Sequence, residues 1–236
     1  MDRFAFCRRF AVARCAAWGL ALGGVAALAA PPAADPFDGR SLAGWMAADG
    51  SEGTAGWEIT DGVFHLRSDA VRKENGAKAG HLVTREEFGD FQLAFEWKVA
   101  PGGNSGIKYR VRRYGTRWLG CEYQIYDDVG ARVIPDRNRS GALYDLFEPA
   151  ADKVLHPAGE WNSARILVKS GHVEHWLNGQ RIVSADVGNP EWERRIAESK
   201  FNDVPDFARN TRGRFMLTSH GSEVWYRNFR FEPLGE

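Results

Sequence analysis

The chain has 236 residues, and its 31 basic and 31 acidic residues give a formal net charge of zero. This balance leaves no broad basic field, which argues against nucleic acid as a partner. The length and the 44% share of hydrophobic residues fit one all-β domain with a sizeable core.

The first 30 residues have the pattern of a secretory signal peptide. Basic residues from Arg3 to Arg14 precede an apolar run over residues 16–30, and Ala27-Leu28-Ala29 matches a small-residue cleavage site. The run is too short to stay in a membrane as a spanning helix. We therefore expect an exported protein, periplasmic or secreted, without membrane association after cleavage. Residues 31–36 would form a linker and residues 37–236 one domain.

Export changes the cysteine count. Cys7 and Cys15 lie in the predicted leader, so the mature chain would keep only Cys121 and could form no internal disulfide. Cys121 falls within a strand pattern, where a buried cysteine usually serves as a small hydrophobe. The core must therefore stabilise the domain without a covalent link.

Strand patterns dominate the first half of the domain. The Asp61-Gly62 pair predicts a tight hairpin turn, because both positions of such a turn need positive φ. In the longest pattern, apolar and polar residues alternate without a break, as in a half-buried antiparallel strand. The expected strands cover residues 57–59, 63–66, 91–99, 107–111 and 121–126.

The second half continues in the same way, with one exception. Asn178-Gly179 predicts another hairpin, and the stretch from Pro190 to about Ser199 predicts a helix, with acidic residues in its first turn and basic residues later. Many short strands with one short helix predict an all-β jelly-roll sandwich. The later strands cover residues 164–168, 172–177, 181–184, 215–219 and 224–231.

The outward positions of the middle strands carry an unusual set of side chains. Glu96, Arg110, Glu122 and Gln124 occupy these positions, and His220 lies at the end of a late strand. Mixed acids and bases on one sheet face favour a hydrogen-bonding cleft for a sugar. A solvated ladder of cross-strand ion pairs is the alternative, and the pattern does not decide between them.

Two loop features bear on ligands. Residues 102–106 are small and polar and open a strand, so a ligand could approach the backbone there. Asp127, Asp128 and Asp136 are candidate metal ligands, although their spacing matches no calcium loop.

A series of short motifs follows one order along the domain. The motifs are residues 37–45, Trp57 with 61–62, 103–107, Arg110, Gly120 to Asp127, 141–144, 159–162, 176–179, 199–201, 220–221 and 227–228. Each motif is weak alone, but their common order is specific, and over residues 36–233 it resembles the 3-keto-disaccharide hydrolase domain family. One block departs from the family pattern, because Thr218 and Ser219 precede His220-Gly221 where the family usually has Gln and Asp.

The resemblance implies a concanavalin A-like sandwich that cleaves glycosides oxidised at C3. A C3 ketone acidifies the C2 proton, so elimination needs a base, an acid and a stabiliser of negative oxygen. Glu122 and His220 would be base and acid, in an order left open, and Arg110 the stabiliser. Asp127 would orient His220 or help to hold a divalent metal, which is a candidate cofactor rather than one that the sequence requires. The expected substrate-binding residues are Glu96, Asn104, Lys108, Gln124 and Tyr144.

Three hypotheses remain for the function. The chain is an enzyme acting on 3-keto-glycosides, a non-catalytic lectin-like module that binds carbohydrate, or a structural or partner-binding domain. An ordinary glycosidase is a variant of the first, and it would need the Glu96 and Glu122 carboxylates about 5 Å or about 6.5–9.5 Å apart.

Overall fold

The computed structural model describes residue 1 and residues 35–68, 80–130 and 132–235. Met1–Pro32 and Ala33–Glu236 form separate units, and all elements below belong to the second. The predicted signal peptide beyond Met1 and most of the predicted linker lie outside the described residues. Within the described residues, no helix is both long and apolar enough to cross a membrane.

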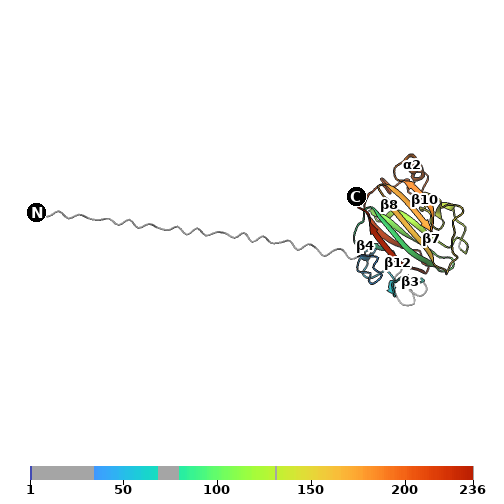
Figure 1. Cartoon of the computed structure of the whole chain (residues 1–236), viewed down its shortest axis with the longest axis horizontal. Helices are drawn as coiled ribbons and strands as arrows, with labels where there is room; N and C mark the ends of the chain where they lie inside the picture. The colour runs from blue at the N-terminus through green and yellow to red at the C-terminus, as the bar shows by residue number, and fades with distance from the viewer. Residues whose placement is uncertain (2–34, 69–79, 131, 236) are drawn as a thin grey trace. The chain divides into compact units, whose positions relative to one another are not determined.

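Two antiparallel sheets build the second unit (Figure 1). The first sheet has five strands in the order β1-β4-β11-β6-β7. Its strands are β1 (Trp45–Ala47), β4 (Leu82–Thr84), β6 (Asn104–Tyr114), β7 (Arg117–Tyr126) and β11 (Arg214–Ser219).

The second sheet has seven strands in the order β10-β9-β8-β5-β12-β3-β2. A short 3-10 helix, Asp136–Asn138, and one α-helix, α2 (Pro190–Ala197), complete the described elements. The strands are β2 (Trp57–Thr60), β3 (Val63–Leu66), β5 (Phe91–Val99), β8 (Asn162–Lys169), β9 (His172–Leu177), β10 (Gln180–Asp186) and β12 (Val224–Pro233).

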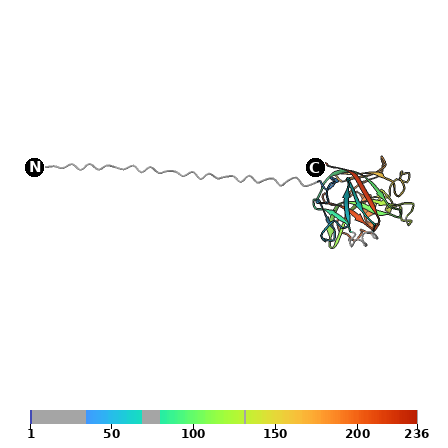
Figure 2. The same cartoon turned by 90° about the horizontal axis from the view of Figure 1, so that it is seen from below.

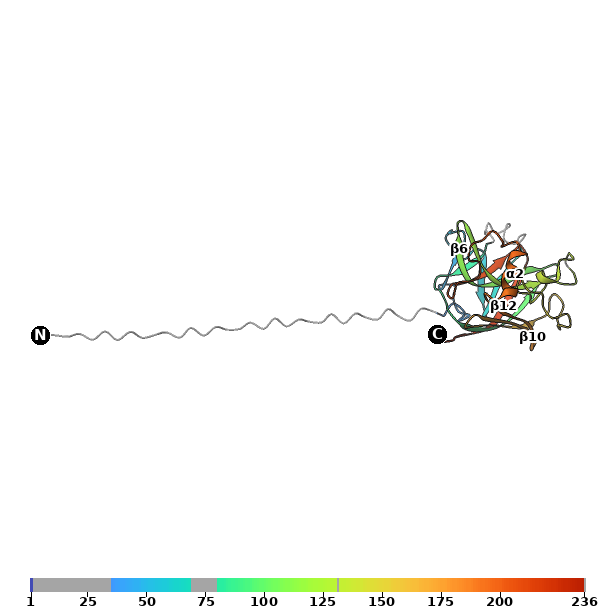
Figure 3. The ribbon, with the colours of Figure 1, turned by 90° about the horizontal axis from the view of Figure 1, so that it is seen from above.

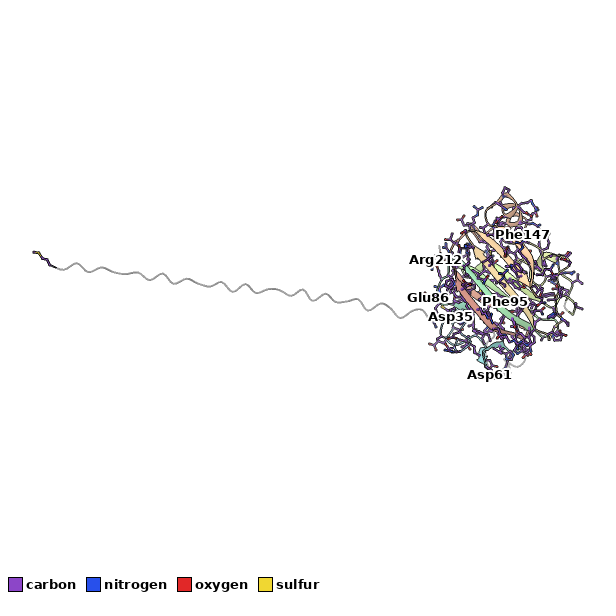
Figure 4. All side chains as sticks on the ribbon, in the orientation of Figure 1. Asp35, Asp61, Glu86, Phe95, Phe147 and Arg212 are labelled. Atoms are coloured by element: carbon purple, nitrogen blue, oxygen red, sulfur yellow. The ribbon has the colours of Figure 1, made fainter. Side chains whose placement is uncertain are left out.

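The core lies between the two sheets. Alternate residues of each strand point into it, as the sequence pattern predicts, and the ring of Phe95 on β5 lies 5.7 Å from that of Tyr123 on β7. Figure 4 labels Phe95 on the second sheet. Figure 2 and Figure 3 show the layers from below and above, with β6 and β10 on opposite sides in Figure 3. The all-β jelly-roll sandwich predicted from the sequence is confirmed.

The local signals also proved correct. Asp61 and Gly62 have φ of 51° and 78°, and Asn178 and Gly179 have 47° and 84°, as their hairpin turns require. The predicted helix forms as α2, where the Asn189 side chain accepts the backbone N–H of Trp192. Trp192 is buried, and its ring packs 5.8 Å from that of Phe147, which Figure 4 labels.

A β-bulge in β6 departs from the predicted alternation. Tyr109 pairs with Cys121 and Arg112 with Leu119, so two residues of β6 face only Gly120. Arg110 takes a positive φ of 50° at this point. The bulge resets the alternation, because Val111 rather than Arg110 packs with Val83 and Met216 on the face turned away from the core. The bulge therefore takes the Arg110 side chain off this outer face of the sheet.

Candidate active site

The face of the five-stranded sheet turned away from the core carries a cluster of polar side chains. On β6, β7 and β11 the alternate positions, such as Ile107, Tyr123 and Leu217, fill the core. The remaining positions therefore gather on one outer face, beside the apolar group of Val83, Val111 and Met216. The polar members are Asn104, Lys108, Glu122, Gln124 and Thr218.

Glu122 lies at the centre of this cluster and is only 6% exposed. Lys108 faces it directly in the β6–β7 register, with 3.7 Å between Lys108 Nζ and Glu122 Oε2. The hydroxyl of Thr218 on β11 lies 3.5 Å from Glu122 Oε1. Gly106 leaves room for the carboxylate, because a Cβ there would stand 2.5 Å from Oε1. Three strands thus fix the position of one buried carboxylate.

Two histidines lie beside this pair. The His81 and His220 rings stand 6.0 Å apart at an angle of 69°. Burial, then Lys108 and His220, lower the pKa of His81 to about 4. Partial burial also lowers the pKa of His220, although the residue keeps part of its surface open to solvent. The negative charge of Glu122 opposes this effect, and the positive charges of Lys108 and Lys200 add to it. Both imidazoles are therefore neutral at neutral pH.

Tyr144 and Lys200 extend the cluster. The backbone N–H of Tyr144 donates to the carbonyl of Glu122 over 3.0 Å, which attaches residues 141–144 to the free edge of β7. The Lys200 ammonium lies 4.1 Å from the centre of the Tyr144 ring. On the β6–β7 side, Gln124 donates to Asn104 over 3.2 Å. These groups surround the Glu122 region with hydrogen-bond donors and acceptors.

A cavity of about 370 Å³ opens on this face. Lys108 and His81 line one part of it, and Met216 and Trp118 provide apolar wall. Its size falls within the usual range of small-molecule sites. A second hollow of about 340 Å³ lies on the other sheet, where Arg165 is engaged by Trp176 and Gln92.

Comparison with known proteins identifies the family. The sequence model of the family described as the 3-keto-alpha-glucoside-1,2-lyase-like domain matches residues 32–232. This chain belongs to that family. The resemblance inferred from the motifs is thereby confirmed.

Individual relatives agree with the assignment. A 3-keto-disaccharide hydrolase of Bacteroides thetaiotaomicron is 30% identical over 224 residues, which span 84% of this chain and 77% of that protein. A crystal structure from Parabacteroides distasonis, provisionally named a glycosyl hydrolase, is 31% identical with a TM-score of 0.72, covering 85% of this chain and 93% of that one. Another from the same organism, with the same provisional name, is 24% identical with a TM-score of 0.58 over 80% and 99% of the two chains, which shows the fold alone.

Two residues expected at this family's site lie elsewhere. Arg110 turns away at the bulge and is 5% exposed, with its guanidinium 2.6 Å from Asp90 at the start of the other sheet. Glu96 lies on the outer face of the seven-stranded sheet, where Arg227 pairs with it at 2.8 Å. The expectation that both share a face with Glu122 is wrong, and the Glu96–Glu122 pair of an ordinary glycosidase does not form.

The aspartates proposed as metal ligands have other partners. Asp127 accepts the backbone N–H groups of Gly102, Val129 and Gly130. Burial works against its ionisation, but these bonds outweigh burial and lower its pKa. Asp128 pairs with Lys153, and Asp136 with Arg139. Among the described residues, no group of three His, Cys, Asp or Glu side chains could hold a metal ion.

Sequence reasoning missed three members of the cluster. His81 precedes a strand of only three residues, too short for an alternation to be recognised. Lys200 lies within the matched motif at residues 199–201, and this match is the signal that points to it. Thr218 was treated only as a departure from the family pattern, yet its hydroxyl faces Glu122.

Proposed function

We propose that this chain cleaves 3-keto-glycosides by elimination at C1–C2 followed by hydration. One observation carries the proposal: Glu122, Lys108, His81 and His220 converge on one sheet face at the edge of the 370 Å³ cavity. The family and the name of the Bacteroides relative support this class of substrate.

The chemistry begins with removal of the C2 proton. A ketone at C3 makes this proton acidic, and the electron pair left at C2 is shared with the C3 oxygen as an enolate. His220 is the base in our assignment, because its lowered pKa keeps the imidazole unprotonated. The Glu122 carboxylate, which favours the charged ring, then stabilises the imidazolium.

The enolate collapses in the second step. The C3 carbonyl re-forms, a C1–C2 double bond appears, and the C1–O bond breaks so that the aglycone leaves with its electron pair. The imidazolium of His220 returns the proton to the leaving oxygen. Water then adds to C1 while C2 regains a proton, so the sum of the steps is hydrolysis.

Lys108 replaces Arg110 as the stabiliser of negative oxygen. Lys108 lines the cavity and its ammonium lies 3.7 Å from Glu122 Oε2, whereas the Arg110 guanidinium is bound to Asp90. A fixed positive charge at the growing oxyanion lowers the barrier most in a site that excludes water. Asn104, Gln124 and Tyr144 would hold the sugar hydroxyls.

The test uses 4-nitrophenyl 3-keto-α- and β-glucosides in deuterated water. Wild type should release nitrophenol and 3-keto-glucose with deuterium at C2, and should leave the unoxidised glucosides intact. Glu122→Gln and His220→Gln should each lower kcat about 10²-fold or more, while Glu96→Gln should not. Binding of the keto sugar without turnover would instead identify a lectin-like module, and full activity of both site variants would refute the site.

We also propose export of the mature domain, on the strength of the leader pattern in residues 1–30. Expression of the full gene in a Gram-negative host and mass spectrometry of the periplasmic fraction would test it. A mature amino terminus near residue 30 is expected, and an uncleaved chain in the cytosol would contradict the proposal.

A further inference from the structure

His81 has a ring whose two nitrogens are in different situations. The residue directly precedes β4, and its carbonyl accepts the backbone N–H of Ala48 over 2.9 Å. The ring nitrogen Nδ1 receives the backbone N–H of Ser219 over 2.9 Å. The first bond attaches the His81 backbone to the residue after β1, and the second attaches the His81 ring to β11.

The second bond determines the tautomer. A backbone N–H can only donate, so Nδ1 must accept and carries no proton. A neutral imidazole then has its single proton on Nε2. The lowered pKa of His81 supports the neutral form of the ring, since burial and the adjacent Lys108 charge both oppose a second proton.

The remaining N–H is available to a ligand. His81 lines the cavity together with Lys108. Within the described parts of the chain, no residue forms a hydrogen bond with Nε2, and the centre of the His220 ring lies 6.0 Å from that of His81. The wall of the cavity therefore presents an imidazole N–H beside an ammonium group.

Building on the function proposed above, we propose that His81 donates its Nε2–H to the C3 carbonyl oxygen of the keto sugar. A neutral imidazole N–H is a very weak acid, so it stabilises the enolate oxygen by hydrogen bonding without protonating it. Lys108 supplies the positive charge for the same oxygen.

This arrangement also discriminates between ketone and alcohol at C3. The His81 Nε2–H and the Lys108 ammonium both donate, and a ketone oxygen only accepts. A C3 hydroxyl could also accept both bonds, but its own proton needs an acceptor, and neither member of this pair supplies one. A buried polar group left without a partner is costly, so the pair selects the oxidised sugar.

Kinetics of matched variants test the assignment. His81→Phe keeps the ring volume and removes the donor, and we expect kcat to fall about 10²–10³-fold with little change in KM. His81→Asn can accept from Ser219 and still donate, so it should recover a large part of the loss. His65→Phe serves as control, because His65 stacks on Trp225 on the other sheet. Wild-type rates in His81→Phe would overturn the assignment while leaving the proposed function intact.

Two spectroscopic measurements separate this assignment from the proposed function. Nitrogen NMR of the labelled protein should show His81 protonated at Nε2 alone at pH 7, and protonation at Nδ1 would overturn the assignment. The infrared carbonyl stretch of a ¹³C3-labelled keto-glucoside bound to Glu122→Gln should shift to lower frequency, and adding His81→Phe should remove the shift. If a keto sugar binds to the wild type without being cleaved, the proposed function is refuted. The infrared shift would still show whether His81 forms a hydrogen bond with the C3 carbonyl oxygen.

Discussion

Lys108 and Glu122 face each other directly across the β6–β7 pair, with 3.7 Å between Nζ and Oε2. The two side chains are 17% and 7% exposed, so water screens their interaction only in part. The pairing depends on the register set before the bulge at Arg110. A cation and a carboxylate are thereby fixed next to the cavity by backbone hydrogen bonds.

The first prediction concerns this lysine. Lys108→Met should lower kcat on a 3-keto-glucoside about 10²-fold or more, because the enolate oxygen loses its nearest positive charge. Steady-state kinetics with the nitrophenyl substrate measure the effect. Lys98→Met is the matched control, since Lys98 lies against Trp161 and Trp225 on the other sheet. Equal losses in the two variants would mean that Lys108 acts only through stability.

A second prediction follows from the closeness of Gly106 to Glu122. In Gly106→Ala the new methyl would stand 2.5 Å from Glu122 Oε1, the end of a flexible side chain, and 3.1 Å from both Glu122 Cγ and the Tyr123 carbonyl oxygen. The protein should fold and the carboxylate should shift, and a displacement of about 1 Å can reduce the rate about 10²-fold. Gly89→Ala is the control, because its methyl would meet the end of Arg212 away from the site. Unchanged kcat in Gly106→Ala would show that the position of Glu122 is not critical.

The third prediction distinguishes a structural from a catalytic role for Arg110. Arg110→Met removes the ion-pair partner of the 14% exposed Asp90, which keeps the hydrogen bond from the Ser170 N–H, and should reduce the free energy of unfolding by about 3 kcal/mol. Urea titration measures this loss. The half-exposed Arg227–Glu96 pair gives the comparison, since Arg227→Met should cost about 1 kcal/mol or less. Folded Arg110→Met should turn over substrate at nearly the wild-type rate, and a large loss of kcat with normal stability would return Arg110 to the site.

The fourth prediction concerns the acid limb of the pH profile, where kcat/KM falls as the pH is lowered. His220 must be neutral to accept the C2 proton, and its pKa is lowered from 6.5. The value of kcat/KM should therefore be constant near neutral pH and should fall as the pH drops through a pKa below 6.5. His220→Gln should lack this limb in its residual activity. A limb that persists in His220→Gln would assign it to Glu122 or another group.

The fifth prediction concerns the stability of the core. His175 is fully buried between the sheets, where it lies 2.9 Å from the Tyr109 hydroxyl and its Nδ1–H donates to the Gly141 carbonyl. Burial lowers its pKa to about 4, although bonds to Gly141 and Ala142 oppose this. Between pH 6.5 and about 4 the unfolded chain binds a proton here that the folded chain does not, so stability rises with pH across this window.

The size of this effect can be measured. The pKa shift of His175 changes the free energy of unfolding by about 3 kcal/mol over the whole pH window. Unfolding at pH 7 and at pH 4.5 should show a larger loss in wild type than in His175→Gln, whose side chain does not titrate. Equal losses in the two proteins would mean that His175 takes up its proton in the folded state.

Local sequence signals were enough for most elements of the fold, and the two strands that they missed, β1 and β4, have three residues each. β5 has the predicted bounds, and both hairpin turns have the backbone angles that their Asp-Gly and Asn-Gly pairs require. Strand alternation is set by the two-residue repeat of side chains, which is readable from a single strand. The same repeat correctly placed Glu122 and Gln124 on one face and Cys121 in the core.

The composition of the site was only partly predictable. Alternation in β6 gave Arg110 the same face as Lys108, and no local signal marked the bulge that reverses this. Glu96 follows the alternation correctly, but the pattern of one strand does not reveal which sheet will contain it. His81 comes from a three-residue strand and reaches the site because β4 pairs with β11.

The sequence by itself therefore determined ten of the strands, the turns, the helix and the membership of Glu122 and His220 in an ordered series of family motifs, but not β1 or β4. The tertiary structure alone decided which cations accompany them and which tautomer His81 takes. These properties depend on register, on one extra residue in β6 and on a backbone N–H from β11. Such long-range pairings are formed by the sandwich as a whole and leave no trace in the spacing of any single segment.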